Sequence, residues 1–213
     1  MTNITKDYIT EYIQGLTETK DPQLLEMEEY AKKHFVPIIE PEVARFLETL
    51  VKMKKPKKIL EIGTAIGYSA LIMYKAQPDC HITTIEIKDE MYYKAIENFQ
   101  KADAREHIHS ICGDGLEAVR FLEGPFDFVF LDAAKGHYKE YFDEALLRLN
   151  SGGVILSDNI LFRGMVASDD LVEHRKITIV RRLREYLTYI TNLEGVSTSI
   201  IPLDDGMAIT IKD

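Results

Sequence analysis

The sequence has few cysteines, no long apolar run and no excess of positive charge. Its two cysteines, Cys80 and Cys112, form no CxxC pattern. This usage argues against a disulfide framework and fits a reducing cytoplasm. No run reaches the roughly 20 apolar residues that span a bilayer, and the first residues lack the basic and apolar regions of a secretory signal. We therefore expect a cytoplasmic protein that does not enter the membrane.

The net charge is negative, with 26 basic and 35 acidic residues giving −9. A polyanion is repelled by such a surface, which argues against indiscriminate nucleic-acid binding. Two basic stretches are local exceptions, one at residues 52–58 and one at residues 175–184. Charge runs of this kind usually face water, so the composition alone gives neither stretch a partner.

No repeat, low-complexity tract or long Pro/Gly linker divides the chain. We expect one domain over residues 1–213, since this length fits a single core. Helix starts at Asp21-Pro22 and Glu40-Pro41 predict an N-terminal helical cover over residues 1–55. Residues 56–213 then form the predicted α/β core.

Apolar strands alternate with helices from residue 58 onward. Strands are expected at residues 58–62, 81–86, 107–112, 126–131 and 154–156, and helices at 67–76, 88–102, 115–122 and 138–149. Continuous apolar strands suit a parallel sheet covered on both faces. A long helix at about 170–193 follows, and a turn-rich link makes strands 197–201 and 207–211 antiparallel neighbours. This pattern predicts a doubly wound α/β sheet with ligands at the carboxyl ends of its strands.

The loop after the first strand is glycine-rich but matches neither the GxGxxG fingerprint nor a Walker motif, which argues against a nicotinamide oxidoreductase. Acids stand at the ends of the first three strands: Glu61, Glu86 and Asp114. They disfavour a phosphate-rich ligand and suit one with an ammonium, a sulfonium and ribose hydroxyls, and Glu86 is placed to accept from a ribose. The alternative is that each acid only solvates a strand end.

A second polar group follows the next two strands, with Asp132 after one and Asp158-Asn159 after the other. Three oxygen donors without Cys or His indicate a hard cation, Mg²⁺ with Mn²⁺ or Ca²⁺ as alternatives. These side chains could equally cap their own turns. Lys135 follows Asp132 by three residues and is either a catalytic residue beside the cation or a solvated loop lysine.

These residues resemble the cation-dependent O-methyltransferase family, which includes catechol and caffeoyl-coenzyme A methyltransferases. The likeness runs from about residue 37 to the end of the chain. It rests on these motifs: Leu60-Glu61-Ile62-Gly63-Thr64 with Gly67-Tyr68-Ser69, Phe130-Leu131-Asp132-Ala133-Ala134-Lys135, Ser157-Asp158-Asn159 and Asp205-Gly206-Met207-Ala208. The resemblance implies a Rossmann-like class I methyltransferase fold, with a mostly parallel seven-stranded sheet, an antiparallel C-terminal hairpin and extra N-terminal helices. It also implies a homodimer.

Site residues follow from the same resemblance. The contacts it implies for S-adenosylmethionine are Ile39, Glu61, Gly63, Ser69, Glu86, Asp114 and Asp132. The implied metal ligands are Asp132, Asp158 and Asn159, and the implied catalytic residues are Lys135, as the base, and Asp132.

Two departures from the small-molecule members of the family narrow the range of expected substrates. Ala134 stands where these members usually have Asp, and Phe162 where they have Trp. With a basic segment at Arg175, Lys176, Arg181 and Arg182, the sequence is most similar to the branch that converts 5-hydroxyuridine at the bacterial tRNA wobble position to 5-methoxyuridine. The expected partner is therefore a tRNA anticodon loop. The alternatives are a small-molecule catechol-type methyltransferase and a non-catalytic RNA-binding module that retains the fold.

Overall fold

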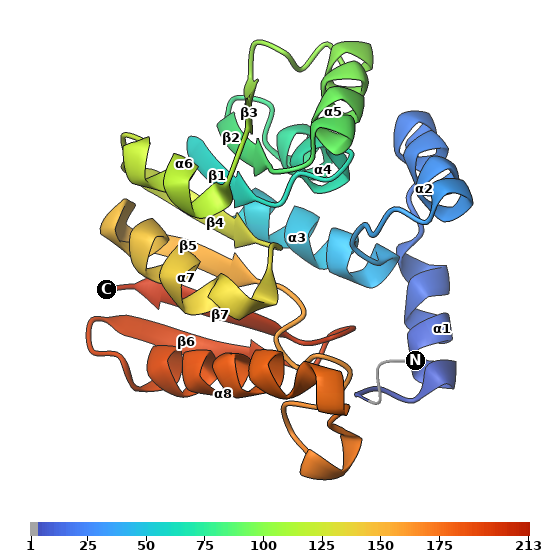
Figure 1. The fold of residues 1–213 in the computed structure, drawn as a ribbon. Helices are drawn as coiled ribbons and strands as arrows, with labels where there is room; N and C mark the ends of the chain where they lie inside the picture. Colours follow the sequence, from blue (N-terminus) through green and yellow to red (C-terminus); the bar gives the residue numbers. More distant parts are fainter. Residues whose placement is uncertain (1–3) are drawn as a thin grey trace.

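The computed structural model describes residues 4–213, which fold around one seven-stranded sheet (Figure 1). The strands are β1 (Lys58–Ile62), β2 (His81–Glu86), β3 (Ile108–Cys112), β4 (Phe126–Leu131), β5 (Leu149–Ser157), β6 (Val196–Ile201) and β7 (Met207–Lys212). Their order is β3-β2-β1-β4-β5-β7-β6. β1 to β5 are mutually parallel, and β7 runs antiparallel to both β5 and β6. The predicted parallel sheet with an antiparallel C-terminal hairpin is confirmed.

Helices cover both faces of the sheet because its strands are apolar on both sides. Side chains alternate between two cores along β1, with Ile59 in one and Leu60 in the other. The first core receives α3 (Pro41–Lys54), α4 (Tyr68–Ala76) and α5 (Asp89–Lys101). The second receives α6 (Gly115–Phe121), α7 (Tyr138–Leu147) and α8 (Ile177–Asn192). Figure 1 shows the second set of helices on one side of the sheet.

Two further helices precede the sheet, α1 (Asp7–Thr17) and α2 (Pro22–His34). Asp21 begins α2 as its N-cap, because its side chain accepts hydrogen bonds from two backbone N–H groups of the first turn. α2 buries Leu24, Met27 and Ala31 in the first core, whereas α1 buries none of its residues. Within the described residues, no helix has both the length and the apolar character needed to span a bilayer.

Two predicted elements differ from the structure by more than two residues at one end. The last helix begins at Ile177, and the residues before it form two 3₁₀ turns, Asp169–Leu171 and His174–Lys176. These turns bury no side chain, so no apolar contact extends α8 backwards, and its buried face starts at Val180. β5 is longer than predicted because Leu149 pairs with Phe126 across a register shift.

Candidate active site

A large pocket lies at the carboxyl ends of the five parallel strands. Its volume is about 1350 Å³, and it includes Gly63, Glu86, Gly113, Asp132 and Asp158 from the ends of β1 to β5. Ligand pockets usually measure about 300–1,000 Å³, so this one has room for a cofactor and part of an acceptor. Five residues of the predicted cofactor set line it: Ile39, Gly63, Glu86, Asp114 and Asp132.

Gly63 joins two strand ends as well as lining the pocket. Its φ is +103°, and a Cβ there would lie 1.9 Å from the backbone oxygen of Asp132. The Gly63 N–H donates to Ile85, and the Asp132 N–H donates to Ile62, so the ends of β1, β2 and β4 are tied together. Only glycine leaves room for this packing.

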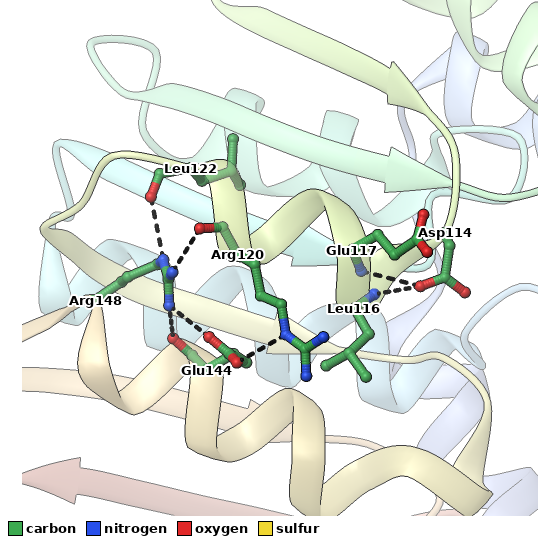
Figure 2. Close-up of polar contacts among 7 residues, drawn as sticks. All are labelled: Asp114, Leu116, Glu117, Arg120, Leu122, Glu144 and Arg148. Atoms are coloured by element: carbon green, nitrogen blue, oxygen red, sulfur yellow. Dashed lines mark hydrogen bonds and ion pairs between the residues drawn. The ribbon is translucent and has the colours of Figure 1, made fainter.

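Glu86 and Asp114, two predicted cofactor contacts, are held by backbone donors in the part of the pocket that we call the cofactor side. Glu86 is buried at the end of β2 and accepts from the N–H groups of Ala65 at 2.7 Å and Lys88 at 2.9 Å. Asp114 begins α6 as its N-cap, and its Oδ1 accepts from Leu116 at 2.9 Å and Glu117 at 3.0 Å (Figure 2). These bonds fix both carboxylates with further lone pairs available to a ligand.

Glu61 and Ser69, the other two predicted cofactor contacts, lie behind the pocket wall and bond to one another. The Ser69 hydroxyl lies 2.6 Å from Glu61 Oε1, and the Thr84 hydroxyl donates to Glu61 Oε2. Glu61 is wholly buried because β1 lies between β2 and β4. Desolvation raises its pKa to about 8, although the two hydroxyl groups act in the opposite direction.

The predicted metal ligands Asp132, Asp158 and Asn159 line one part of the pocket together with Lys135, and we call this part the acceptor side. Asp158 is 1% exposed, and its Oδ1 accepts from the Asn159 N–H at 2.6 Å. Burial raises the pKa of both carboxyl groups above the ordinary value for Asp, and the charge of Asp132 further raises the pKa of Asp158. Two desolvated carboxylates that repel one another fit a divalent cation, which would offset both charges.

The third oxygen of this candidate cation site is an amide oxygen. Within residues 4–213, no group of three or more His, Cys, Asp or Glu side chains is arranged to hold a metal ion. Lys135 lies in a 3₁₀ turn, Lys135–His137, and its Nζ donates to Asn159 Oδ1 at 2.8 Å. The predicted catalytic lysine therefore contacts the predicted metal ligand directly.

The link between β6 and β7 holds the chain that follows Asn159. The backbone N–H groups of Ile160 and Leu161 donate to Gly206 and Asp205, and the Arg163 N–H donates to the Asp205 carboxylate. Asn159, Phe162 and Arg163 all have positive φ, which side-chain-bearing residues adopt rarely. The turn-rich link that includes Asp205-Gly206 predicted the C-terminal hairpin, but not this contact with the chain after Asn159.

Pocket residues absent from the sequence prediction come from distant segments. Glu40 precedes α3, and Asp204 and Asp205 follow β6, yet all three line the acceptor side. Desolvation raises the pKa of each, and Asp204 raises the pKa of Glu40. The acceptor side is therefore more acidic than the predicted residues alone imply.

The basic segment divides into residues with different partners. Arg175 and Lys176 lie in the second 3₁₀ turn, where Lys176 stacks over the Phe162 ring at 5.8 Å. Arg181 is exposed and lies 3.8 Å from Glu185. Arg182 instead donates to the backbone oxygen of Gly136 at 2.9 Å, so it contacts the protein itself.

Comparisons with known proteins agree with this geometry. The model of a family described as O-methyltransferase matches residues 16–213. A catechol O-methyltransferase from Niastella koreensis is 29% identical over 99% of both chains, and a caffeoyl-CoA O-methyltransferase from Populus kitakamiensis is 30% identical over 88% of this chain and 85% of its own. The crystal structure of an O-methyltransferase from Bacillus cereus in complex with SAH has a TM-score of 0.85 and 25% identity, and covers 97% of both chains.

Proposed function

The chain belongs to the O-methyltransferase family and is an S-adenosylmethionine-dependent enzyme of the catechol and caffeoyl-CoA type, and we propose that a divalent cation assists it in methylating 5-hydroxyuridine at the tRNA wobble position. The observation that carries the proposal is the convergence of Asp132, Asp158, Asn159 and Lys135 at the acceptor side of the pocket. Ala134 and Phe162, where small-molecule members usually have Asp and Trp, support the tRNA branch.

Cation binding rests on the two repelling carboxylates. Asp132, Asp158 and the Asn159 amide oxygen would hold Mg²⁺, or Mn²⁺ or Ca²⁺ in its place. When bound, the cation would favour ionisation of the acceptor hydroxyl and hold its oxygen in place. The Lys135 Nζ lies on this group and is positioned to take the hydroxyl proton or to offset the negative charge on the oxygen.

The methyl transfer itself is a displacement at carbon. The acceptor oxygen forms a bond to the methyl group as the sulfur–methyl bond breaks, and the hydroxyl proton leaves. Alignment of such groups supplies about 7–11 kcal/mol of a barrier in favourable cases. The main task of this chain is therefore to fix the cofactor through Glu86 and Asp114 and the acceptor through Asp132 and Asp158.

The tRNA would meet the outside of the pocket. Arg175 and Arg181 are exposed cations, and Arg175 lies in the turn whose Lys176 is over the ring of Phe162, a pocket residue. Phosphates pair with such side chains. An anticodon loop can present a single unstacked base to a pocket, and the pocket of about 1350 Å³ has room for one beside the cofactor.

The homodimer expected from the resemblance stays a prediction. α1 buries none of its residues and exposes Tyr8, Tyr12 and Leu16. An apolar helix face of this kind would suit a second copy of the chain. Light scattering of the wild type and of Tyr12→Glu would test it, and a monomeric wild type would contradict it.

The decisive experiment is methyl transfer from labelled S-adenosylmethionine to tRNA that contains 5-hydroxyuridine, with Mg²⁺ or with excess chelator. We expect labelled 5-methoxyuridine at the wobble position with Mg²⁺ and none with chelator. Labelling that persists in excess chelator would contradict the proposed cation dependence. A tRNA that stays unlabelled would contradict the proposed substrate.

The second candidate is a small-molecule catechol-type methyltransferase. The names of the relatives favour it, since one is a catechol and the other a caffeoyl-CoA enzyme. A catechol assayed beside the tRNA separates the two, because label in the catechol alone would select the small-molecule function and keep the cation site. A non-catalytic RNA-binding module would leave both acceptors unlabelled.

A further inference from the structure

We propose that Arg182 and Arg184 are positioning residues, which tie the two loops that carry the catalytic and metal-binding groups to α8. The first loop, residues 132–138, carries Asp132 and Lys135. The second, residues 158–168, carries Asp158 and Asn159. The inference rests on the proposed roles of these groups, but not on the identity of the acceptor.

Each arginine reaches a different loop. The Arg182 Nη1 donates to the Gly136 carbonyl at 2.9 Å, in the same 3₁₀ turn as Lys135. The Arg184 Nε donates to Val166 at 2.9 Å and its Nη2 donates to Met165 at 3.2 Å. Hydrogen bonds from a charged donor are among the stronger ones, so these contacts restrain both loops.

The geometry of α8 explains why the two arginines reach different loops. Leu183 lies between the two arginines and is 0% exposed, so its side chain fixes which face of α8 meets the second core. Successive residues of a helix are separated by about 100°, so positions 182 and 184 project on opposite sides of Leu183. One arginine is thereby directed to each loop.

Two further contacts hold the second loop, residues 158–168, against α8 and the turn before it. Arg184 Nη1 pairs with the carboxylate of Asp169 at 2.7 Å, which closes the end of the 158–168 loop. Lys176, from the turn before α8, lies over the ring of Phe162 in the same loop. Because Lys135 Nζ and Asn159 Oδ1 come from different loops, their 2.8 Å contact depends on how the loops are held relative to one another.

The Gly136 carbonyl therefore already accepts from the Arg182 guanidinium, which a tRNA phosphate would otherwise bind. The sequence interpretation makes Arg182 a tRNA contact beside Arg181, its neighbour on α8. A phosphate contact and a loop tie predict different kinetics. Loss of a phosphate contact weakens tRNA binding and its salt dependence alone. Loss of a loop tie lowers turnover of every acceptor and weakens the cation site.

The test compares Arg182→Gln and Arg184→Gln with a control, Arg120→Gln. Arg120 also has an intramolecular partner, Glu144 at 3.0 Å, but lies on α6 in a separate polar network (Figure 2). Three quantities are measured for each variant: the affinity for Mn²⁺ by electron paramagnetic resonance, the affinity for S-adenosylmethionine by calorimetry, and kcat and KM for tRNA and for a catechol.

For Arg182→Gln we expect kcat to fall about tenfold on each acceptor that the wild type methylates, since small displacements near the chemistry cost up to about 10²-fold. Mn²⁺ affinity should fall about tenfold, as it does when groups behind the ligands are removed. Arg184→Gln should lose more, because it removes three contacts. S-adenosylmethionine affinity and the control should stay at wild-type values.

Arg182→Lys distinguishes positioning from misfolding. A lysine can donate the bond to the Gly136 carbonyl that Arg182→Gln loses, so this variant should recover part of kcat and of Mn²⁺ affinity. An unchanged Mn²⁺ affinity in Arg182→Gln, with a raised KM and a lower salt slope for tRNA alone, would overturn the proposal in favour of a phosphate contact. A wild type inactive on both acceptors would reject the proposed substrates, and Mn²⁺ binding would still decide the role of the arginines.

Discussion

The two sides of the pocket use their carboxylates in opposite ways. On the cofactor side, Glu86 and Asp114 each accept two backbone hydrogen bonds. On the acceptor side, burial raises the pKa of Asp132, Asp158 and Asp204. The cofactor side is preorganised by backbone donors, whereas the acceptor side brings several buried carboxyl groups together around one lysine, Lys135. This difference predicts that the acceptor side depends on an added ion and the cofactor side does not.

The largest expected effect is at Asp158. Asp158→Asn keeps an oxygen for the Asn159 N–H but removes the charge. Loss of one preorganised charged group typically costs about 10²–10³-fold in turnover, so kcat with Mg²⁺ should fall by that order. The apo protein should be as stable as the wild type or more so, because a repelled buried charge is gone.

Turnover and thermal unfolding of Asp158→Asn without metal check both halves of this prediction. S-adenosylmethionine affinity serves as the control, since the substitution lies on the other side of the pocket. Retained Mg²⁺-dependent turnover would remove Asp158 from the cation site.

The matching change on the cofactor side is Glu86→Ala, with a smaller effect. Charged hydrogen bonds contribute about 1.5–3 kcal/mol, so S-adenosylmethionine affinity should fall about 10- to 100-fold. Mn²⁺ affinity should not change. Calorimetry with each ligand checks both expectations. Glu86→Gln keeps one acceptor oxygen, so its S-adenosylmethionine affinity should lie between those of the wild type and Glu86→Ala. A loss of Mn²⁺ affinity would mean that the two sides are not independent.

Glu61 is an acid next to the cofactor side whose pKa is raised by burial, as it is for the carboxyl groups of the acceptor side. An unfolded Glu releases its proton near pH 4.5, whereas in the fold the pKa of Glu61 is about 8. Stability from this group is full below pH 4.5 and is lost as the pH rises toward 8, by up to about 1.4 kcal/mol per pH unit. Relative to Glu61→Gln, the apo wild type should therefore lose at least about 2 kcal/mol between pH 5 and pH 8.

Urea unfolding at the two pH values measures this difference, and Glu117→Gln, an exposed acid on α6, is the control. Parallel stabilities of wild type and Glu61→Gln would show that Glu61 is ionised inside the fold. Glu61 would then resemble Glu86, a carboxylate held by hydrogen-bond donors, rather than Asp158, whose pKa is raised by burial.

The sequence predicted the sheet better than the segments that close the pocket. β4 has the predicted bounds because its nearly continuous apolar run ends at Asp132, and β2 because its Ile and Thr residues end at Glu86. α8 was predicted too long because the polar turns before it carry no periodic apolar signal to mark its start. The turn-rich link indicated the C-terminal hairpin, but nothing local indicated that β7 would lie between β5 and β6.

The same limit holds for the site. Asp132 and Asp158 were predictable because they directly follow buried strands, where a parallel sheet brings ligands together. Glu40 and Asp204 come from connections outside that pattern, and only the folded chain places them in one pocket. The interior position of Glu61 was hidden because a strand end and a strand interior have the same apolar neighbours in sequence.

Asp204 gives the smallest effect and tests the charge of the acceptor side directly. It is half-buried, and its neighbours on that side include Glu40, so a cationic acceptor is favoured over an anionic one. Charges about 7 Å apart across a solvated pocket interact by about 0.6 kcal/mol, and a cation and an anion differ by about twice that. Asp204→Asn should therefore lower the ratio of kcat/KM for a catechol amine to that for a catechol carboxylate by about sevenfold. If neither is methylated, their inhibition constants against the labelled reaction give the same ratio. A ratio unchanged in Asp204→Asn would mean that the carboxylate faces neither compound, and that the acidity of this side serves the cation alone.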